Sequence, residues 1–372
     1  MEPFKQKLDA YALKKIAQEI KAVAPSFDAK NFLKNTISPI EDLELKERVQ
    51  LIATQIHQNL PLNFPQAAQI LQKTLADKDN DLSDQWESSS KEKLNGFLVW
   101  PLTQFIENYG LDFFEESMQA LYEMTQRFTA EFALRSFLDK HYHKTYKRLQ
   151  KWKKDPSHHV RRLVSESTRP KLPWAKKVDH LLNNLNKNID LLLSLKNDPS
   201  LYVRRSVANH LNDISYLDEK LFIKTLSTFG HSKNEQWIKR HASRTLLKKG
   251  NPQIFKMHGY DPTAKLELKA NLSPKNLYEG EKIKLKLQIK NLEKNEKKIL
   301  IDYVIYYLKK NGNYSPKTFR VKDTFIKESI QLEKVIHLKK VTTRKHYSGK
   351  HYLEIKMNGK SHKKLHFFLK HS

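Results

Sequence analysis

Two stretches of the chain repeat almost the same eight residues, 43 positions apart. Residues 155–162 read DPSHHVRR and residues 198–205 read DPSLYVRR. In each copy the Asp-Pro pair is suited to the start of a helix, and the Val supplies an apolar anchor on the inner side. The pair of arginines then comes at the same place in both copies, so stacked copies predict a stripe of positive charge along one face.

The spacing matches a two-helix repeat of the HEAT type, which is about 40–47 residues long. A weaker third copy at residues 237–242 (WIKRHA) keeps the apolar-basic-basic order without the Asp-Pro pair. Helical spacing of apolar residues also marks residues 43–52, 113–138 and 178–195. Because each repeat buries its apolar face only against its neighbours, we expect a curved solenoid with a concave and a convex side.

The sequence changes its period near residue 260. From residue 265 onward apolar residues alternate with polar ones, and Gly- or Asn-containing turn signals separate the runs. Seven or so short strands in the last 108 residues predict an immunoglobulin-like β-sandwich, here without the cysteine pair of antibody domains. The apolar runs that predict strands are 265–268, 283–289, 299–308, 330–332, 351–355 and 365–369.

The predicted fold class is therefore a multidomain α + β protein. Residues 1–258 form an all-α HEAT-like domain, residues 259–264 a linker, and residues 265–372 an Ig-like β-sandwich. The chain has no cysteine, which excludes disulfides, Cys-ligated zinc and iron–sulfur clusters. None of its nine glycines falls in a Rossmann or P-loop pattern, so no nucleotide cofactor of those kinds is predicted.

The charge of the chain favours a polyanionic partner. Lys and Arg number 68 against 41 Asp and Glu, a net charge of +27. The predicted sandwich alone has 27 Lys and Arg against 10 Asp and Glu, which suggests a second DNA-facing surface. Nucleic acid is the first candidate and an anionic membrane surface the rival. No apolar run approaches the 18 or so residues of a spanning helix, and the N-terminus lacks an apolar signal core.

Carboxylates on a phosphate-binding stripe weaken binding and need a reason. Glu166 follows Arg162 by four residues, which indicates either an exposed ion pair or a functional acid. The matching position of the second repeat is Asn209, and Asp213, four residues further on, is either a helix-end or turn residue or a functional acid. Glu131 is either solvent-facing or half-buried among apolar residues. Trp174 ends a proline-stiffened connector and is either held at the rim of the solenoid or plugged into the core.

The predicted DNA contacts come from the repeated motif and its surroundings. Four histidines (141, 143, 158 and 159) have spacings that do not place pairs on one helix face, so no metal site is predicted. Trp237 shares the choice between surface and core that Trp174 has. The predicted DNA-binding residues are Arg161, Arg162, Arg169, Arg204, Arg205, Trp237, Lys239 and Arg240.

Five blocks of sequence resemble a known family, the AlkC branch of the AlkD-like HEAT-repeat DNA glycosylases, and its subgroup with a C-terminal Ig-like domain. The resemblance covers nearly the whole chain, and the blocks come in the right order. They are residues 43–49 (LELKERV), 96–110 (GFLVWPLTQFIENYG), 125–134 (TQRFTAEFAL), 160–174 (VRRLVSESTRPKLPW) and 198–214 (DPSLYVRRSVANHLNDI).

The resemblance implies a monofunctional glycosylase of base excision repair. It would hydrolyse the N-glycosidic bond of cationic bases, N3-methyladenine and N3-methylcytosine, without drawing the base into a deep pocket. The family's catalytic residues correspond to Glu131, Glu166, Trp174 and Asp213, with carboxylates stabilising an oxocarbenium-like sugar and one of them orienting water. The resemblance further implies no cofactor, double-stranded DNA with alkylated bases as partner, a monomer, and the bacterial cytosol.

Two other classes of function compete with this reading. A non-catalytic nucleic-acid-binding scaffold would use the same basic stripe, but it has no need of Glu131, Glu166 and Asp213 on that face. A protein-interaction solenoid explains the charge poorly. Release of free bases from methylated DNA separates an enzyme from a scaffold.

Overall fold

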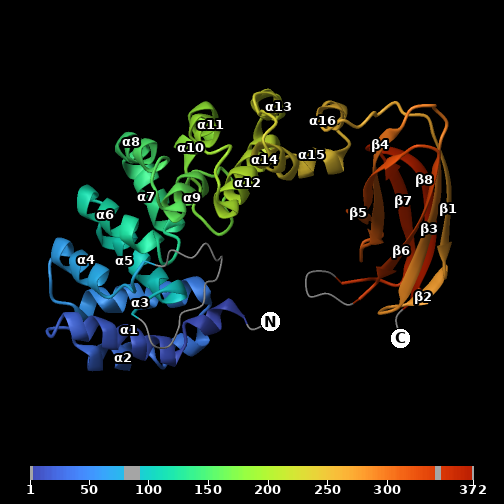
Figure 1. Cartoon of the computed structure of the whole chain (residues 1–372). Helices are drawn as coiled ribbons and strands as arrows, with labels where there is room; N and C mark the ends of the chain where they lie inside the picture. Colours follow the sequence, from blue (N-terminus) through green and yellow to red (C-terminus); the bar gives the residue numbers. More distant parts are fainter. Residues whose placement is uncertain (1–2, 79–92, 340–344, 371–372) are drawn as a thin grey trace. The chain divides into compact units, whose positions relative to one another are not determined.

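Figure 1 shows the computed structural model of the chain, which describes residues 3–78, 93–339 and 345–370. The chain divides into two compact units, Met1–Ala242 and Ser243–Ser372. The first unit is helical, and the second contains two further helices and the strands. Within the described ranges no helix is long and apolar enough to cross a membrane.

The first unit is a succession of short helices joined by short connections. Several begin with an acceptor side chain or a proline suited to a helix start, as at Asp9, Asp28 and Asn63. The helices, with 3₁₀ helices written η, are η1(Phe4–Lys7), α1(Ala10–Val23), α2(Ala29–Thr36), η2(Pro39–Asp42), α3(Leu45–Asn59), α4(Phe64–Lys73), η3(Gly96–Val99), α5(Trp100–Tyr109), α6(Phe114–Thr125), α7(Glu131–Lys140), α8(Tyr142–Trp152), α9(His158–Ser167), α10(Asp179–Asn183), α11(Leu185–Ser194), α12(Leu201–Leu217), α13(Glu219–Ser227) and α14(Lys233–Ala242).

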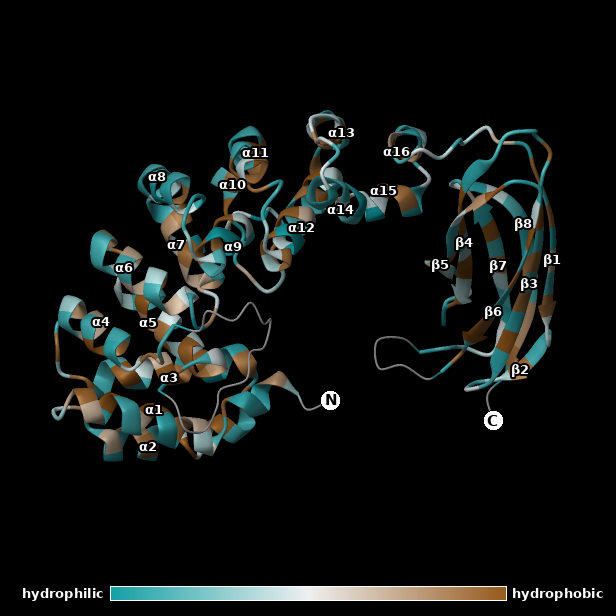
Figure 2. Cartoon of the chain, in the orientation of Figure 1, coloured by the Kyte–Doolittle hydropathy of each residue, from teal (hydrophilic) through white to brown (hydrophobic). Residues whose placement is uncertain are grey.

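These helices form two rows. The inner row consists of α3, α5, α7, α9, α12 and α14, each of which packs on the next. The outer row, α4, α6, α8, α11 and α13, lies along the other side of these helices (Figure 1). Hydrophobic residues colour only part of each helix in Figure 2, as expected where one face is buried against neighbours and the other is solvated. The predicted HEAT-like solenoid is confirmed.

The repeated motif builds the same helix start twice. Asp155 and Asp198 each accept a hydrogen bond on Oδ1 from the backbone N–H two residues later, at 2.8 and 2.9 Å. These Asx turns lead directly into α9 and α12. Val160 and Val203 are fully buried, as the motif predicts. The two copies therefore place equivalent side chains on successive inner helices.

The second unit combines two short helices with a β-sandwich. Its sheets have the strand orders β1-β3-β6 and β2-β8-β7-β4-β5, and all pairings are antiparallel except that of β2 with β8. The elements are α15(Arg244–Lys249), α16(Pro252–Met257), β1(Leu266–Ser273), β2(Asn276–Tyr278), β3(Lys282–Asn291), β4(Lys297–Leu308), β5(Tyr314–Ile326), β6(Ser329–His337), β7(Gly349–Met357) and β8(Lys360–Lys370).

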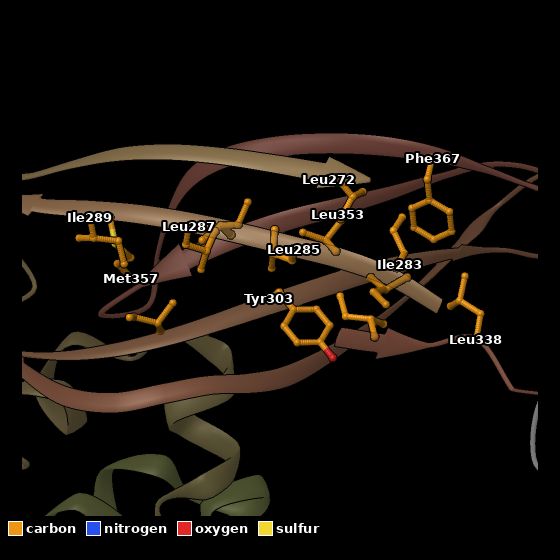
Figure 3. Packing of buried hydrophobic residues seen from close by; sticks show 14 of the residues in the cluster. Leu272, Ile283, Leu285, Leu287, Ile289, Tyr303, Leu338, Leu353, Met357 and Phe367 are labelled. Atoms are coloured by element: carbon orange, nitrogen blue, oxygen red, sulfur yellow. The ribbon is translucent and has the colours of Figure 1, made fainter. Parts of the chain in front are cut away.

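The core of the sandwich lies between the two sheets, as Figure 3 shows. Strand β3 alternates strictly between exposed and buried residues, so Ile283, Leu285, Leu287 and Ile289 all enter the core. The predicted Ig-like sandwich is confirmed. The sequence did not predict β2 and β5, while the other six strands contain the predicted apolar runs.

Helices α15 and α16 pack with the sandwich rather than with the solenoid. Gly250, which ends α15 with a left-handed φ of 84°, lies so close to Gly359 in the β7–β8 turn that a Cβ on Gly250 would come within 2.8 Å of the Gly359 carbonyl oxygen. The change from helix to strand falls between Met257 and Leu266, but the change in packing falls at Ala242. The assignment of residues 1–258 to one domain stays a prediction.

Candidate active site

Three consecutive inner helices bring the predicted carboxylates together. Glu131 is the first residue of α7, Glu166 lies in the last turn of α9, and Asp213 lies on α12. All three are buried, with only 7, 5 and 6% of their surface exposed. None of them is a solvent-facing ion pair of the kind the sequence left open.

Arg162 joins the first two acids. Its Nη1 donates to Glu131 Oε2 and, at 2.6 Å, to Thr129 Oγ1, while Thr129 Oγ1 itself donates to Glu131 Oε2 at 2.7 Å. Its Nη2 lies 3.5 Å from Glu166 Oε1. One guanidinium therefore ties the start of α7 to the end of α9.

Arg169 joins the second acid to the third. Its Nη1 donates to Glu166 Oε1 at 2.7 Å, and its Nε and Nη2 donate to the two oxygens of Asp213 at 2.9 and 3.2 Å. The remaining oxygen of Glu166 accepts a hydrogen bond of 2.5 Å from Ser206 Oγ on α12. The result is a continuous line of acid, arginine, acid, arginine and acid, with three carboxylates for two guanidiniums.

The two acids that share Arg169 have pKa values moved in opposite directions. Burial raises the pKa of Glu166, but the charges of Arg162 and Arg169 and the hydrogen bond from Ser206 outweigh it and hold the pKa below its ordinary value. For Asp213 burial is the dominant effect and raises the pKa, although Arg169 opposes it. Glu166 is thus held as a carboxylate, whereas burial favours the protonated form of Asp213 more than in an exposed aspartate.

A cavity of about 670 Å³ opens beside this cluster. Glu131, Glu166, Arg162 and Arg169 line it, whereas Asp213 does not line it and is reached through Arg169. Six aromatic residues line it as well. They are Phe4, Phe97, Trp100, Phe128 and Phe132, and Trp174 of the α9–α10 connector completes the set.

Trp174 is held at the rim and is not plugged into the core. Its side chain is 62% exposed, and its φ of 63° is in the left-handed region that non-glycine residues seldom adopt. Its carbonyl oxygen accepts a hydrogen bond of 2.7 Å from Lys46 Nζ. An exposed indole with a fixed backbone is suited to contact a bound partner.

Arg135 holds the connector that carries Trp174, and sequence reasoning missed it. Its Nε donates to the carbonyl oxygen of Lys176 at 2.8 Å, and its Nη1 donates to those of Ser167 and Arg169 at 2.9 and 2.8 Å. Only 1% of Arg135 is exposed, and burial lowers its pKa to about 10. The one available signal was its position four residues after Glu131, on the same side of a helix.

The first arginine of each repeated pair binds within the protein. Arg161 and Arg204 donate through Nη1 to the two carbonyl oxygens of the preceding Asp-Pro, at 2.8 Å in the first copy and 2.7 Å in the second. Arg161 also makes a two-pronged ion pair with Asp198 of the next repeat, at 2.6 and 3.0 Å. Their main contacts are structural.

The other predicted DNA contacts differ in how accessible they are. Arg169 is only 8% exposed between its two carboxylates, which leaves little of it to reach a phosphate. Arg205 is exposed on α12, and Lys239, Arg240 and Trp237 are half-buried on α14. The Trp237 ring stacks on His241 with a centroid distance of 4.9 Å, and the Arg204 guanidinium lies 6.0 Å from its centre. Contact of these residues with DNA stays a prediction.

The arrangement places three carboxylates, held by arginines, beside an aromatic-lined cavity. In the part of the chain that the structure describes, no three His, Asp or Glu side chains form a group that could hold a metal ion. The chemistry that this site supports directly is stabilisation of a developing positive charge and orientation of a water molecule.

Comparisons with known proteins find relatives that match nearly the whole chain. Residues 267–371 match a family model described as the C-terminal Ig-like domain of the uncharacterised protein YhaZ. The chain is 32% identical over 364 residues to YhaZ of Bacillus subtilis (strain 168), covering 96% of this chain and 97% of that protein. It also superposes, with a TM-score of 0.91 and 32% identity, on the Pseudomonas fluorescens alkylpurine DNA glycosylase AlkC bound to DNA containing an abasic site analog, covering 99% of this chain and 100% of that one.

Proposed function

This chain belongs to the family of YhaZ and AlkC, and from that premise we propose that it is a monofunctional DNA glycosylase acting on cationic alkylated bases. The observation that carries the proposal is the line of three buried carboxylates beside Trp174 and an aromatic cavity. A surface that bound phosphate alone would gain nothing from Glu131, Glu166 and Asp213.

The proposed substrates are N3-methyladenine and N3-methylcytosine in double-stranded DNA. Such a base already carries a positive charge, so it leaves the sugar with little need for an acid that protonates it. The site agrees with this requirement, because the pKa of Glu166 lies below its ordinary value and that group is therefore a poor proton donor. The site must instead stabilise the oxocarbenium-like sugar and supply a water molecule.

The acids differ in how they can act on the reacting sugar. Glu166 remains ionised and lines the cavity, so it stabilises positive charge on the sugar. Asp213, whose pKa is raised by burial, adds a third carboxylate that reaches the cavity only through Arg169, and one of the acids orients the attacking water. Glu131 adds negative charge from the start of α7, and the exposed ring of Trp174 offers its π face to the cationic sugar.

The same proposal accounts for the net charge of +27. Arg205 and the basic residues of α14 would neutralise phosphates near the site, and the sandwich would add a second contact with DNA. The sandwich is suited to this because of its excess of Lys and Arg over Asp and Glu. No cofactor enters the proposed reaction, which needs only water.

Release of free base from methylated DNA tests the proposal. We expect the protein to release N3-methyladenine, and Glu166→Gln or Asp213→Asn to lower the single-turnover rate about 100-fold or more. Binding to a duplex with a non-cleavable abasic analogue should change little. Glu116→Gln, an exposed acid on α6, is the matched control and should be fully active.

Two results would contradict the proposal. Tight DNA binding without any base release would indicate the scaffold that the sequence left as an alternative. Equal loss of binding and release in Glu166→Gln, together with a lowered melting temperature, would assign the acid line to the stability of the solenoid.

A further inference from the structure

The outer face of the five-stranded sheet carries a cluster of aromatic rings. Directly paired residues of neighbouring strands point to the same face, and Tyr306 of β4 pairs with Tyr352 of β7, which pairs with His366 of β8. In the next row Lys350 pairs with Phe368. Four rings from three strands therefore share one face.

The strand neighbours of these residues fix which face it is. Ile305, Leu353 and Phe367 are fully buried in the core between the sheets. Since side chains alternate along a strand, Tyr306, Tyr352 and Phe368 project to the opposite side.

The rings remain accessible. Phe368 is 40% exposed, and Tyr314 at the start of β5 is 37% exposed. His366 is exposed, while Tyr306 and Tyr352 are half-buried. The Tyr314 and Tyr352 rings meet edge to face with centroids 5.2 Å apart, which joins β5 to the cluster.

Lysines lie among the rings. The Lys364 ammonium is 4.6 Å from the centre of Tyr352 and 4.9 Å from that of Tyr306, and Lys350 lies 5.4 Å from Tyr352. The nearby carboxylate of Glu354 accepts a hydrogen bond of 2.6 Å from the Tyr306 hydroxyl. It also lies 3.9 Å from the ammonium of Lys356, so this acid is already compensated.

The outer face of the other sheet has the charge without the rings. Along β3 and β6 of the three-stranded sheet the exposed residues include Lys284, Lys286 and Glu333, and Glu333 forms ion pairs of 3.6 and 3.9 Å with the two lysines. The exposed positions of these two strands carry no Phe, Tyr or Trp. Positive charge alone is therefore general to the sandwich, and the aromatic rings are particular to one face.

We propose that the outer face of β4, β7 and β8 binds single-stranded nucleic acid. Aromatic rings on a sheet are platforms on which unpaired bases stack, and interspersed lysines neutralise the phosphates of the same strand. A duplex keeps its bases stacked on one another, so it has no use for the exposed rings. The proposal does not require glycosylase activity, and it assigns a defined ligand to a defined face of the sandwich.

Fluorescence anisotropy with a labelled oligothymidylate of twelve nucleotides tests this face in the full-length protein. Phe368→Ala removes an exposed ring, and Lys364→Gln removes a charge from the same cluster. Val335→Ala and Lys284→Gln, on the outer face of the three-stranded sheet, are the matched controls, since Val335 is 38% exposed and Lys284 is exposed. The same series is measured with a duplex and with phosphatidylglycerol vesicles.

We expect Phe368→Ala to weaken binding of the single strand about 5-fold or more and to leave the slope of log K against log salt unchanged. Lys364→Gln should reduce that slope by about 0.7, the share of one phosphate. Phe368→Ala should not alter duplex or vesicle binding, and Val335→Ala should alter none of the three.

Unchanged oligothymidylate binding in both Phe368→Ala and Lys364→Gln would overturn the proposal. So would losses limited to duplex or to vesicles, which would identify those as the ligand. Base release from methylated DNA, measured in parallel, keeps the two proposals apart. If the protein binds the single strand through Phe368 but releases no base, only the proposed glycosylase activity is contradicted. If it releases base but Phe368→Ala leaves single-strand binding unchanged, only the proposed single-strand site is contradicted.

Discussion

Arg161 and Arg205 show two uses of an arginine within the same repeated motif. Arg161 lies against its own helix start and pairs with Asp198, whose side chain is only 3% exposed. Arg205 occupies the second position of its pair and is exposed. The ion pair of Arg161 could not be predicted from the motif, because it depends on where the next repeat places its Asp.

Substitution of the two residues should separate stability from DNA binding. We expect Arg161→Ala to lower the free energy of unfolding by about 3 kcal/mol, because it leaves Asp198 buried without its charge partner. Arg205→Ala should change stability by no more than about 0.5 kcal/mol and should weaken binding to duplex DNA. Urea unfolding and anisotropy measure the two effects, and a stability loss in Arg205→Ala equal to that in Arg161→Ala would contradict the assignment.

The carboxylates of the site could be predicted from the sequence, but of their partners only Arg162, four residues before Glu166, could. Glu131, Glu166 and Asp213 were identified through the family resemblance, and the structure brings them into one line. Arg135 and His210 were missed, since a buried Arg or His in a helix looks the same in sequence as an exposed one. Only the packing of α7, α9 and α12 shows that both are enclosed.

His210 should make the stability of the solenoid depend on pH. Its Nδ1 donates to the carbonyl oxygen of Ser165 at 3.0 Å, and burial lowers its pKa from 6.5 to about 3. Between these two pH values His210 is protonated in the unfolded chain but neutral in the folded chain. The free energy of unfolding therefore decreases as the pH falls, by about 1.4 kcal/mol per pH unit. His210→Gln should remove this slope between pH 6 and 4, and a parallel pH profile for the two proteins would show that the imidazole is not kept neutral.

At the scale of elements, the connector between α9 and α10 owes its shape to residues from other helices. Arg135 of α7 binds carbonyls at both of its ends, and Lys46 of α3 binds that of Trp174. Two prolines in the connector predicted stiffness. The three-point attachment by Arg135 could not be predicted, because it depends on contacts between residues 32 to 41 positions apart.

A double-mutant cycle tests whether Arg135 acts through this connector. We expect Arg135→Lys, which keeps the charge but not the fork of donors, to lower the rate of base release about 100-fold through misplacement of Trp174. In a Trp174→Ala background Arg135→Lys should lower the rate of base release little further, because the side chain that Arg135 positions is already absent. Two losses that simply multiply would mean that Arg135 acts independently of Trp174, and equal melting temperatures across the four proteins are the required control.

Two strands of the sandwich also could not be predicted from the sequence. Strand β5 was missed because it includes Pro316 and several charged residues, which weaken the alternation of a strand. In the structure β5 lies at the edge of its sheet, the place where proline and charge are tolerated. Strand β2 has only three residues, too few for any period to be recognised.

At the scale of the whole molecule, the change of period in the sequence predicted two parts, but the division by packing is earlier. Asn358 of the β7–β8 turn donates to the carbonyl oxygen of Asp261 at 2.8 Å, and the Tyr260 hydroxyl donates to Asp323 at 2.7 Å. Together with the Gly250–Gly359 contact, these bonds join α15, α16 and the following loop to the sandwich. A sequence reveals where helices stop and strands begin, not which neighbour a helix packs against.

The two boundaries predict different fragments. We expect residues 243–372 to fold as a cooperative unit and residues 265–372 to be less stable by at least about 3 kcal/mol, because the shorter fragment loses the buried side chains of Ile254, Phe255 and Tyr260. Thermal unfolding of both fragments measures the difference, and Phe255→Ala in the longer fragment should account for a substantial part of it. Equal midpoints for the two fragments would place α15 and α16 outside the folding unit of the sandwich. A lower midpoint for the shorter one would show that the last two helices belong to the sandwich in energy as well as in contact.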